Sequence, residues 1–477
     1  MTSRVFGAVD IGASGGRVMA GVLDGGEIRL ETLHRFANGV AQHDGHLRWN
    51  LTRLFREVLT GLAVLAERHP CVESIGIDTW AVDYALLDSH GTLLAEPVAY
   101  RDGRTASAIS RVDTLVSRRE QFEINGLQHL PFATLYQLEA EKSSDVWEQA
   151  RHIVLLPDLL SYWLTGHLAT ERTNASTTGL VDVRTGLWAT DLMARLDLPP
   201  SRFPELDNPG TIRGILLPEV VSATGLPSRC VVTAVGSHDT ASAVVGVPAT
   251  IEAFAYVSSG TWSLAGLELE APVLTPSAFD ANFTNEGGVD GTVRFLRNVG
   301  GLWLLQESLR DWRSRGLGIE EQAVLAAAEG LPAGGPIIDV GDPAFIAPDD
   351  MPRRIDDVLV AQGESPLASP AAVVRCILDS LATAYVATTS QAARLASRDV
   401  DVIHIVGGGS RNDLLCQLTA DLSGRCVVAG PVEATALGNV LVQARTLEAA
   451  PSSLRELRTL LASSVRGELR EFTPAGP

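Results

Sequence analysis

The chain has 477 residues, a net charge of −19 and a pI of about 5.0. Such an acidic chain disfavours nucleic acids and anionic membranes as partners, because both are polyanions. The length exceeds one ordinary hydrophobic core, so we expect two domains. The longest apolar stretches are interrupted by charge or proline, and we expect no membrane span.

Two features favour a cytoplasmic protein. The five cysteines are scattered without a C-x-x-C pair, which is typical of reduced thiols. The first four residues lead directly into the strand-like run VFGAVDIG, so we expect no secretory leader. With an acidic surface and no coiled-coil pattern, a monomer is favoured over a dimer.

Lys142 is the only lysine among the 38 basic residues. A Walker A loop needs a lysine after its glycines, and no such segment is present. Lys142 lies in the polar stretch EAEKSSD, where neither Schiff-base chemistry nor the ATP lysine of a protein kinase is supported. A bound nucleotide would therefore be held by backbone groups, hydroxyls and a metal ion.

The first predicted elements are a strand, a glycine-rich turn and a second strand over residues 5–26. An amphipathic helix is predicted over 51–69, with Asn50 as its cap. Strand, turn and strand follow over 73–94, a helix over 134–150, and an apolar segment over 152–166.

The turn in VDIGASGGR combines Asp10 with three glycines, a serine and Arg17. Glycines allow the backbone to approach phosphate and to turn its N–H groups inward. Asp10, at the end of the strand, could hold the water shell of Mg²⁺. Taken alone, the motif is better explained by an ordinary hairpin turn, and its recurrence later in the chain is what favours a function.

Asp78 and Asp83 flank Trp80 in IDTWAVDY, at a predicted strand end. The acids could contact sugar hydroxyls while the indole offers a flat apolar face. A hairpin with solvated acids explains the same pattern equally well.

Asp239 stands between a β-branched run and a stretch of small residues, in VVTAVGSHDTASAVVG. A helix N-cap is the simpler interpretation, because Asp accepts backbone N–H bonds at helix starts. The alternative is a catalytic base held at the mouth of a sheet.

The opening pattern returns in the second half as AFAYVSSGTWSLAGLELE, which predicts another strand, hydroxyl-bearing turn and strand. Such an internal duplication is typical of two related domains, with a boundary near 246–252. Residues 400–424 then predict a strand, a triple glycine and a helix, without the G-x-G-x-x-G spacing of a Rossmann dinucleotide site.

Taken together, these segments resemble the FGGY carbohydrate kinases. The resemblance extends from Val9 to about Gly438 and rests on VDIGASGGRV, IDTWAVD, SHDTASAV, VSSGTWSL, NFTNEGG, RNVGGLWLLQES and IVGGGSRNDLLCQLTAD. It implies an α/β fold of two actin-like, ribonuclease-H-like domains with a nucleotide and sugar cleft between them. Residues 1–247 would carry the sugar site, the first phosphate hairpin and the catalytic Asp; residues 248–477 would carry the second hairpin and the adenine site.

The resemblance also implies roles for individual residues. Asp239 would be the general base, and Asp10 would bind Mg²⁺. The sugar-binding residues would be Ala81, His238, Thr240 and Asn298. The ATP-binding residues would be Ala13, Ser14, Gly15, Gly16, Arg17, Thr261, Gln306 and Gly408.

The implied reaction is transfer of the γ-phosphoryl group of MgATP to the 1-hydroxyl of a small-molecule ketose. The combination of motifs is similar to that of the family members that act on L-rhamnulose. With this sugar the product would be L-rhamnulose 1-phosphate. Ala81 stands where these kinases usually have glycine, so L-fuculose, ribulose or xylulose remain alternatives. A sugar-independent ATPase of the actin or chaperone type would leave SHDTASAV unexplained.

Overall fold

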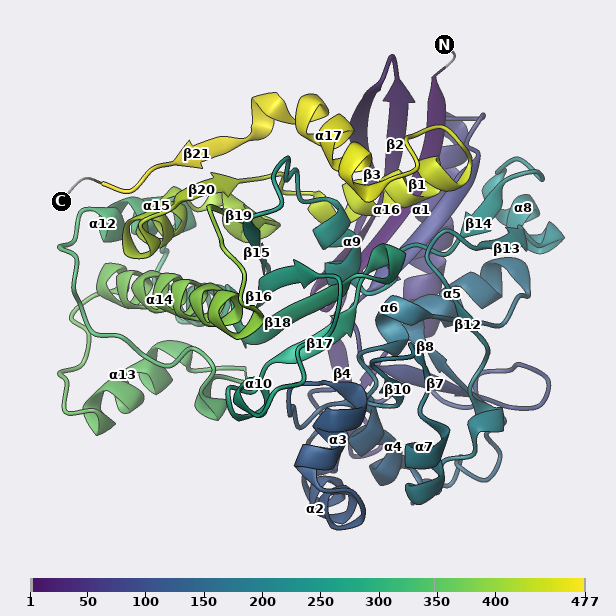
Figure 1. Ribbon diagram of the computed structural model, residues 1–477, viewed down its shortest axis with the longest axis horizontal. Coiled ribbons are helices and arrows are strands. Elements are labelled where there is room, and N and C mark those ends of the chain that lie inside the picture. Colours follow the sequence, from purple (N-terminus) through teal and green to yellow (C-terminus); the bar gives the residue numbers. More distant parts are fainter. Residues whose placement is uncertain (1–2, 347, 476–477) are drawn as a thin grey trace. The chain divides into compact units, whose positions relative to one another are not determined.

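A computed structural model describes residues 3–346 and 348–475 (Figure 1). The chain forms two compact units, each assembled from separate stretches of sequence. Unit 1 comprises Met1–Thr250, Glu268–Phe295 and Ala434–Arg466; unit 2 comprises Ile251–Leu267, Leu296–Glu433 and Gly467–Pro477. These units are defined by spatial contacts, and the predicted domain division at residues 247/248 stays a prediction.

Unit 1 is built on a six-stranded sheet with the order β13-β14-β6-β1-β2-β3. β1 pairs antiparallel with β2 and parallel with β6, which places Asp10 opposite both Arg17 and Asp78. The strands are β1 (Arg4–Gly12), β2 (Gly15–Asp24), β3 (Glu27–Ala37), β6 (Ser74–Thr79), β13 (Ile212–Ile215) and β14 (Val231–Thr233).

The predicted amphipathic helix is confirmed as α1 (Leu51–Arg68). Asn50 caps it by accepting the Arg53 N–H at 2.8 Å, as predicted. Its buried side recurs at helical spacing and includes Leu54, Val58 and Leu62, each fully buried.

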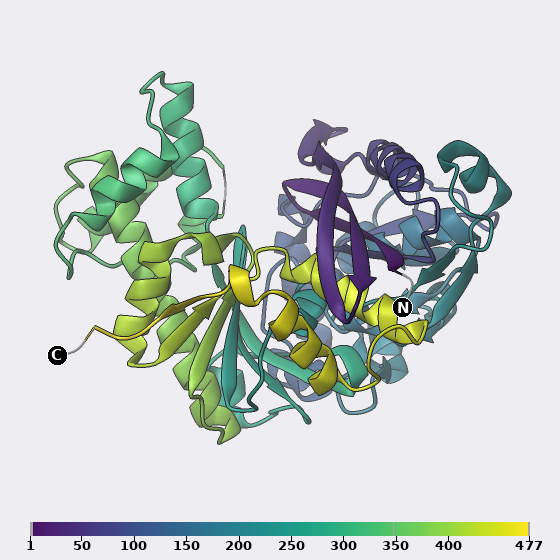
Figure 2. The ribbon, with the colours of Figure 1, turned by 90° about the horizontal axis from the view of Figure 1, so that it is seen from above.

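Helix α9 (Asp239–Val245), which begins at the predicted base, packs unusually close to α16 (Ala434–Thr446). A Cβ at Gly438 would lie 1.9 Å from the Ser242 carbonyl oxygen, and one at Gly246 would lie 2.0 Å from that of Ala434. Glycine at both positions therefore permits backbone contact between the two helices. In Figure 2 the yellow helices α16 and α17 (Leu454–Ser464) lie beside the purple strands of the same unit.

The remainder of unit 1 consists of short elements outside this sheet, one of which pairs into the second sheet. The helix predicted over 134–150 ends at Glu141 because the following KSSD segment folds into turns, as Ser and Asp favour. The elements are β4 (Val40–His43), β5 (His46–Trp49), β7 (Tyr84–Leu87), α2 (Ala106–Leu115), α3 (Arg118–Asn125), α4 (Thr134–Glu141), β8 (His152–Leu155), α5 (Leu156–Thr165), β9 (Thr170–Glu171), α6 (Arg172–Ala175), β10 (Val181–Asp182), β11 (Leu187–Trp188), α7 (Thr190–Arg195), β12 (Leu206–Asp207), α8 (Pro218–Thr224), α10 (Pro276–Asp280) and β17 (Thr284–Gly287).

The second sheet has the order β17-β18-β16-β15-β19-β20-β21. β15 pairs antiparallel with β16 and parallel with β19, which repeats the relation of β1 to β2 and β6. The internal duplication predicted from the two hairpins is thereby confirmed in the strand pairing. The elements are β15 (Phe254–Ser259), β16 (Trp262–Leu269), β18 (Val293–Gly300), α11 (Trp303–Ser314), α12 (Glu321–Glu329), α13 (Met351–Ala361), α14 (Pro370–Ala396), β19 (Val402–Val406), α15 (Asp413–Ser423), β20 (Cys426–Ala429) and β21 (Arg470–Phe472).

Helix α14 bears on the expectation that the chain has no membrane span. Within residues 3–346 and 348–475 it is the one helix that passes by length and composition, with 27 residues and a mean hydropathy of 1.4 over its most apolar window. In unit 2, however, 67% of that window is buried, as in the core helix of a folded domain.

Candidate active site

The first hairpin brings the predicted phosphate residues together at one turn. Asp10 is buried at the end of β1, and Arg17 Nε on β2 donates to its Oδ2 at 3.0 Å. Of the connecting residues, Ala13 is partly exposed and Ser14 is exposed. A hollow of about 430 Å³ is lined by residues 14–17 and 35–37, so backbone and guanidinium groups border an open space large enough for a phosphate chain.

Three carboxylates influence one another next to this hairpin. Asp78 is fully buried, and its Oδ2 accepts a hydrogen bond from Asn439 Nδ2 at 2.6 Å. Burial raises the pKa of Asp78 well above its usual range, the negative charges of Asp10 and Asp239 raise it further, and the Asn439 bond opposes the rise. Its other oxygen, Oδ1, is buried without a hydrogen-bond partner.

These oxygens suit a Mg²⁺ ion. Mg²⁺ is bound by hard oxygen ligands, usually one or two carboxylates together with waters and substrate phosphates. The Asp10 carboxylate, with Asp78 beside it, supplies oxygens of this kind. Oδ1 of Asp78, which has no hydrogen-bond partner in the protein, is a further acceptor. In the described part of the chain no three His, Cys, Asp or Glu side chains are grouped as a closed metal site, and Mg²⁺ held partly by water and phosphate needs none.

Asp239 is the first residue of α9, and its side chain is 32% exposed. Thr240 Oγ1 donates to Asp239 Oδ1 at 3.1 Å, and His238 Nε2 lies 3.4 Å from the same oxygen. The N-cap position belongs to His238, and no side chain caps the helix. The N-cap interpretation of Asp239 is therefore wrong, because Asp239 lies one residue inside the helix and makes no capping hydrogen bond.

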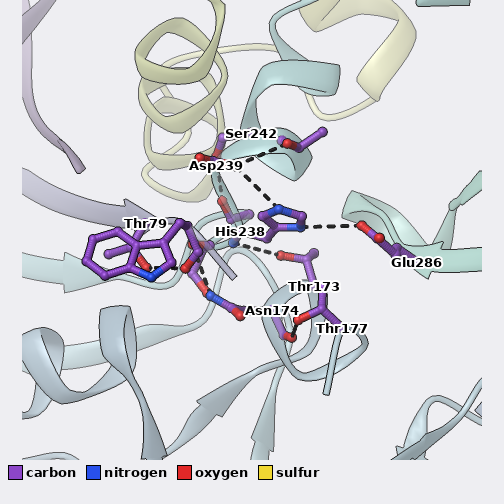
Figure 3. Close-up of polar contacts among 12 residues, drawn as sticks. Thr79, Thr173, Asn174, Thr177, His238, Asp239, Ser242 and Glu286 are labelled. Atoms are coloured by element: carbon purple, nitrogen blue, oxygen red, sulfur yellow. Dashed lines mark hydrogen bonds and ion pairs between the residues drawn. The ribbon is translucent and has the colours of Figure 1, made fainter. Parts of the chain in front are cut away.

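His238 is held from its other side by two buried charged residues, Arg294 and Glu286, and Figure 3 shows the contact with Glu286. Arg294 Nη2 lies 3.1 Å from His238 Nδ1, and Glu286 Oε2 lies 3.5 Å from the same nitrogen. Burial raises the pKa of Glu286, but the charge of Arg294 and the contact with His238 outweigh this, so the pKa lies below its usual range. Glu286 is thus an anion that is paired with Arg294 on the Nδ1 side of the His238 ring.

The backbone before His238 is anchored by Glu171, which is fully buried at the end of β9. Glu171 Oε2 accepts from the Ser237 backbone N–H at 2.9 Å and from the Ser237 hydroxyl at 2.7 Å. From the other side, the Thr79 N–H donates to the Ser237 carbonyl at 2.9 Å. Hydrogen bonds on both sides fix the Ser237–His238 segment, and with it the start of α9.

Ala81 begins a strained turn. The Asp83 N–H donates to the Ala81 carbonyl at 2.9 Å, and Val82 between them has a φ of 67°. A hydrogen bond from i+2 to i around a positive φ defines a γ-turn, which is rare for a β-branched residue. Thr134 Oγ1 and Gln137 Nε2 bind the Val82 carbonyl at 2.7 and 3.3 Å, which holds the turn in place.

The residue that ends this turn, Asp83, is 1% exposed, and its carboxylate is held by hydrogen bonds from several elements. Its Oδ2 accepts from the indole N–H groups of Trp49 at 2.6 Å and Trp80 at 2.9 Å. The Tyr100 N–H at 3.3 Å and Gln137 Nε2 at 3.1 Å complete the set. The interpretation of Asp83 as a contact for sugar hydroxyls is therefore not supported, because both of its oxygens are used by the protein.

Replacing Asp83 with Asn should change the pH dependence of stability. Burial raises the pKa of Asp83 to about 6, although its hydrogen bonds oppose the rise. A raised acid pKa means that the folded state holds the proton more tightly than the unfolded chain. The contribution of Asp83 to stability is thus fully present below about pH 4 and is lost as the pH rises through about 6. The shift corresponds to roughly 3 kcal/mol.

Urea unfolding of both proteins across this range measures the effect. The free energy of unfolding of the wild type minus that of Asp83→Asn should fall between about pH 4 and 7, because all other groups titrate alike in both. A difference that stays constant with pH would contradict the assignment.

In unit 2 the second hairpin turn contacts two of the other predicted segments. The Leu302 N–H donates to the Gly260 carbonyl at 2.9 Å, and the Trp303 N–H to that of Thr261 at 3.2 Å. Gly409 packs against the Ser259 side chain. The structure therefore groups Thr261 with the start of α11 and with the triple glycine. The other predicted residues of unit 2 lie on three elements. Gln306 is exposed on α11, Gly408 begins the short 3₁₀ turn before α15, and Asn298 is half-buried on β18.

Three residues that position this site were missed as functional residues. Glu171 lies outside the motifs on which the family resemblance rests, and Glu286 lies within one of them, NFTNEGG. Arg294 lies on β18 outside any quoted motif. Arg294 is 56 residues from His238, and Glu171 is 66 residues from Ser237, too far for local patterns to indicate the pairing.

A duplicated α/β fold with two glycine-bearing hairpins and a carboxylate at a helix start defines an actin-like phosphotransferase. Residues 5–246 match the model of the N-terminal domain, and residues 255–447 that of the C-terminal domain, of the FGGY family of carbohydrate kinases. The chain belongs to this family. It is an ATP-dependent carbohydrate kinase, and its substrates are a sugar and a nucleotide.

Individual relatives are similar over nearly the whole chain. The chain is 41% identical to the rhamnulokinase of Enterococcus faecalis over 99% of this chain and 95% of that protein. It is 40% identical to the rhamnulokinase of Bacteroides thetaiotaomicron, over 96% and 94% respectively. Among solved structures, gluconate kinase from Lactobacillus acidophilus has a TM-score of 0.80 at 16% identity, covering 99% of this chain and 94% of its own, and shows the same fold.

Proposed function

We propose that this chain phosphorylates the 1-hydroxyl of L-rhamnulose with MgATP, giving L-rhamnulose 1-phosphate, and that Asp239 is the general base. The sugar is suggested by relatives that carry the name rhamnulokinase at about 40% identity over almost the full length. The observation that carries the mechanism is the partly exposed Asp239 carboxylate, fixed at the start of α9 between Thr240 and His238.

Phosphoryl transfer requires in-line positioning and neutralisation of charge more than covalent help. Asp239 would accept the proton of the attacking hydroxyl, and the sugar would be oriented by His238, Thr240, Ala81 and Asn298. Backbone N–H groups at the hairpin turn of Ala13–Gly16, with Arg17, would bind phosphate. Thr261, Gln306 and Gly408 would contribute to the nucleotide site from unit 2.

Mg²⁺ would be held by Asp10 and would neutralise charge on the phosphates. The contact of Arg17 Nε with Asp10 Oδ2, at 3.0 Å, orients that carboxylate. We further propose that the enzyme acts in the cytoplasm, as a monomer rather than a dimer.

The substrate is tested by ADP release with MgATP and L-rhamnulose, L-fuculose, L-ribulose, L- and D-xylulose and glycerol. We expect the greatest kcat/KM with L-rhamnulose. A pentulose lacks the terminal methyl group, and one such group is worth about 10–200-fold in kcat/KM. A higher kcat/KM with another sugar would retain the kinase chemistry and replace the proposed substrate.

A further inference from the structure

A buried charged pair lies directly behind His238. The Arg294 side chain is fully buried, and those of Glu286 and His238 are each 7% exposed. Arg294 Nε donates to the Gly287 carbonyl at 3.0 Å, and Nη1 forms an ion pair with Glu286 Oε2 at 3.0 Å. The guanidinium is therefore fixed by strand β17 on one edge, and its Nη2 is directed at the imidazole.

We propose that Arg294, held by Glu286, fixes His238 in the tautomer that carries its proton on Nε2, so that this N–H points toward the reacting hydroxyl and the Asp239 carboxylate. Arg294 and Glu286 are then positioning residues for phosphoryl transfer. The inference rests on the proposed function, because it gives His238 a role beside the general base.

The chemistry of the donors determines the tautomer. Arginine has five N–H donors and no acceptor. With Arg294 Nη2 at 3.1 Å, His238 Nδ1 must be the acceptor, and the ring proton then sits on Nε2. Glu286 Oε2 is farther from Nδ1, at 3.5 Å, and already faces Arg294.

The opposite side of the ring agrees with this assignment. His238 Nε2 lies 3.4 Å from Asp239 Oδ1, an acceptor when ionised. In the other tautomer a lone pair on Nε2 would face this carboxylate, and an N–H on Nδ1 would face the guanidinium. The Nε2–H form pairs both ring nitrogens with complementary partners, whereas the Nδ1–H form pairs Nδ1 alone, with Glu286 Oε2 at 3.5 Å.

The arrangement also accounts for an unusual feature of the chain path. Glu286 and Arg294 lie on the segment Glu268–Phe295, which belongs to unit 1 although the sequence on both sides of it belongs to unit 2. This excursion brings β17 and the start of β18 against the SHDT segment at the beginning of α9. The two charged residues behind His238 therefore come from this later segment, and not from the part of unit 1 that precedes residue 250.

The wild-type tautomer is measured by NMR of histidine labelled with ¹⁵N at its ring nitrogens, with His238→Asn used to assign the signal. We expect Nδ1 of His238 to show the shift of an unprotonated nitrogen and Nε2 that of a protonated one. A proton on Nδ1 in the wild type overturns the proposal. This readout does not depend on which sugar is the substrate, so the positioning inference and the proposed function can fail separately.

Kinetics test the consequence. Arg294→Met should lower kcat by about 10–100-fold, as is typical when a residue that orients a functional histidine is lost, with KM for MgATP unchanged. Arg294→Lys, which keeps a donor, should restore part of kcat. Because a lone buried Glu286 could prevent folding, the double variant Glu286→Leu/Arg294→Met removes both charges together. Wild-type kcat in a folded double variant would also overturn the proposal.

Arg375→Met is the matched control. Arg375 is another buried arginine, with its side chain 8% exposed, paired with Asp379 at 2.9 Å on α14 in unit 2, and it contacts none of the residues named for the site. Its replacement should alter stability in the manner of any buried ion pair while leaving kcat and the His238 signals near those of the wild type.

Discussion

Asp239→Asn should lower kcat by about 10²–10⁴-fold, the usual contribution of a general base. Asn has the same shape and still accepts the hydrogen bond from Thr240 Oγ1, seen at 3.1 Å in the wild type. It cannot take a proton from the sugar hydroxyl. KM for MgATP should remain close to the wild-type value, because Asp239 is not among the residues proposed to bind nucleotide.

Stability should be unchanged or slightly increased in this variant. The charge of Asp239 contributes to the raised pKa of the buried Asp78, so its removal relieves repulsion within the carboxylate cluster. Thermal unfolding separates this effect from loss of fold. Asp191→Asn is the matched control, since Asp191 is an exposed acid in the first turn of another short helix of unit 1. Near-normal turnover by folded Asp239→Asn would exclude Asp239 as the base.

Local patterns in the sequence predicted those parts of the fold that depend on local physics. The α1 helix and its Asn50 cap follow from apolar spacing and one side-chain hydrogen bond. The two hairpins follow from alternating strands around a glycine turn, and their repetition predicted the duplicated fold. Their roles, and that of Asp239, came from the resemblance to the family.

Contacts between distant residues were not predictable in this way. Nothing in NFTNEGG indicates that Glu286 pairs with Arg294 beneath His238, or that the whole segment Glu268–Phe295 folds with unit 1. The buried roles of Asp83 and Glu171 depend on donors contributed by several elements. The apolar character of α14 depends likewise on burial, which composition alone cannot distinguish from a membrane span.

Glu171→Ala should cause the largest loss of stability among the replacements considered. Its two oxygens accept from three backbone N–H groups and two hydroxyls, contributed by Thr173, Asn174 and Ser237. Each buried donor left without an acceptor costs about 1–3 kcal/mol. Even if water satisfies some of the five, the loss should exceed about 4 kcal/mol, a value that single replacements seldom reach. Thermal and urea unfolding of the two proteins measure it.

Glu171→Gln distinguishes the hydrogen bonds from simple packing. Four of the five donors converge on Oε2, so the amide oxygen of Gln should take that position. Its NH₂ group would then face the Thr173 N–H, which donates to Oε1 at 2.7 Å in the wild type, and a single donor would lose its partner. The Gln variant should therefore lose only about 1–3 kcal/mol.

Because Ser237 anchors the start of α9, kcat should fall in the same order as stability, least for Gln and most for Ala. The assay temperature must lie well below the midpoint of thermal unfolding of both variants. Equal losses in the two variants would show that Glu171 acts through packing volume, and the anchoring of His238 and Asp239 would then have to come from the Thr79 contact alone.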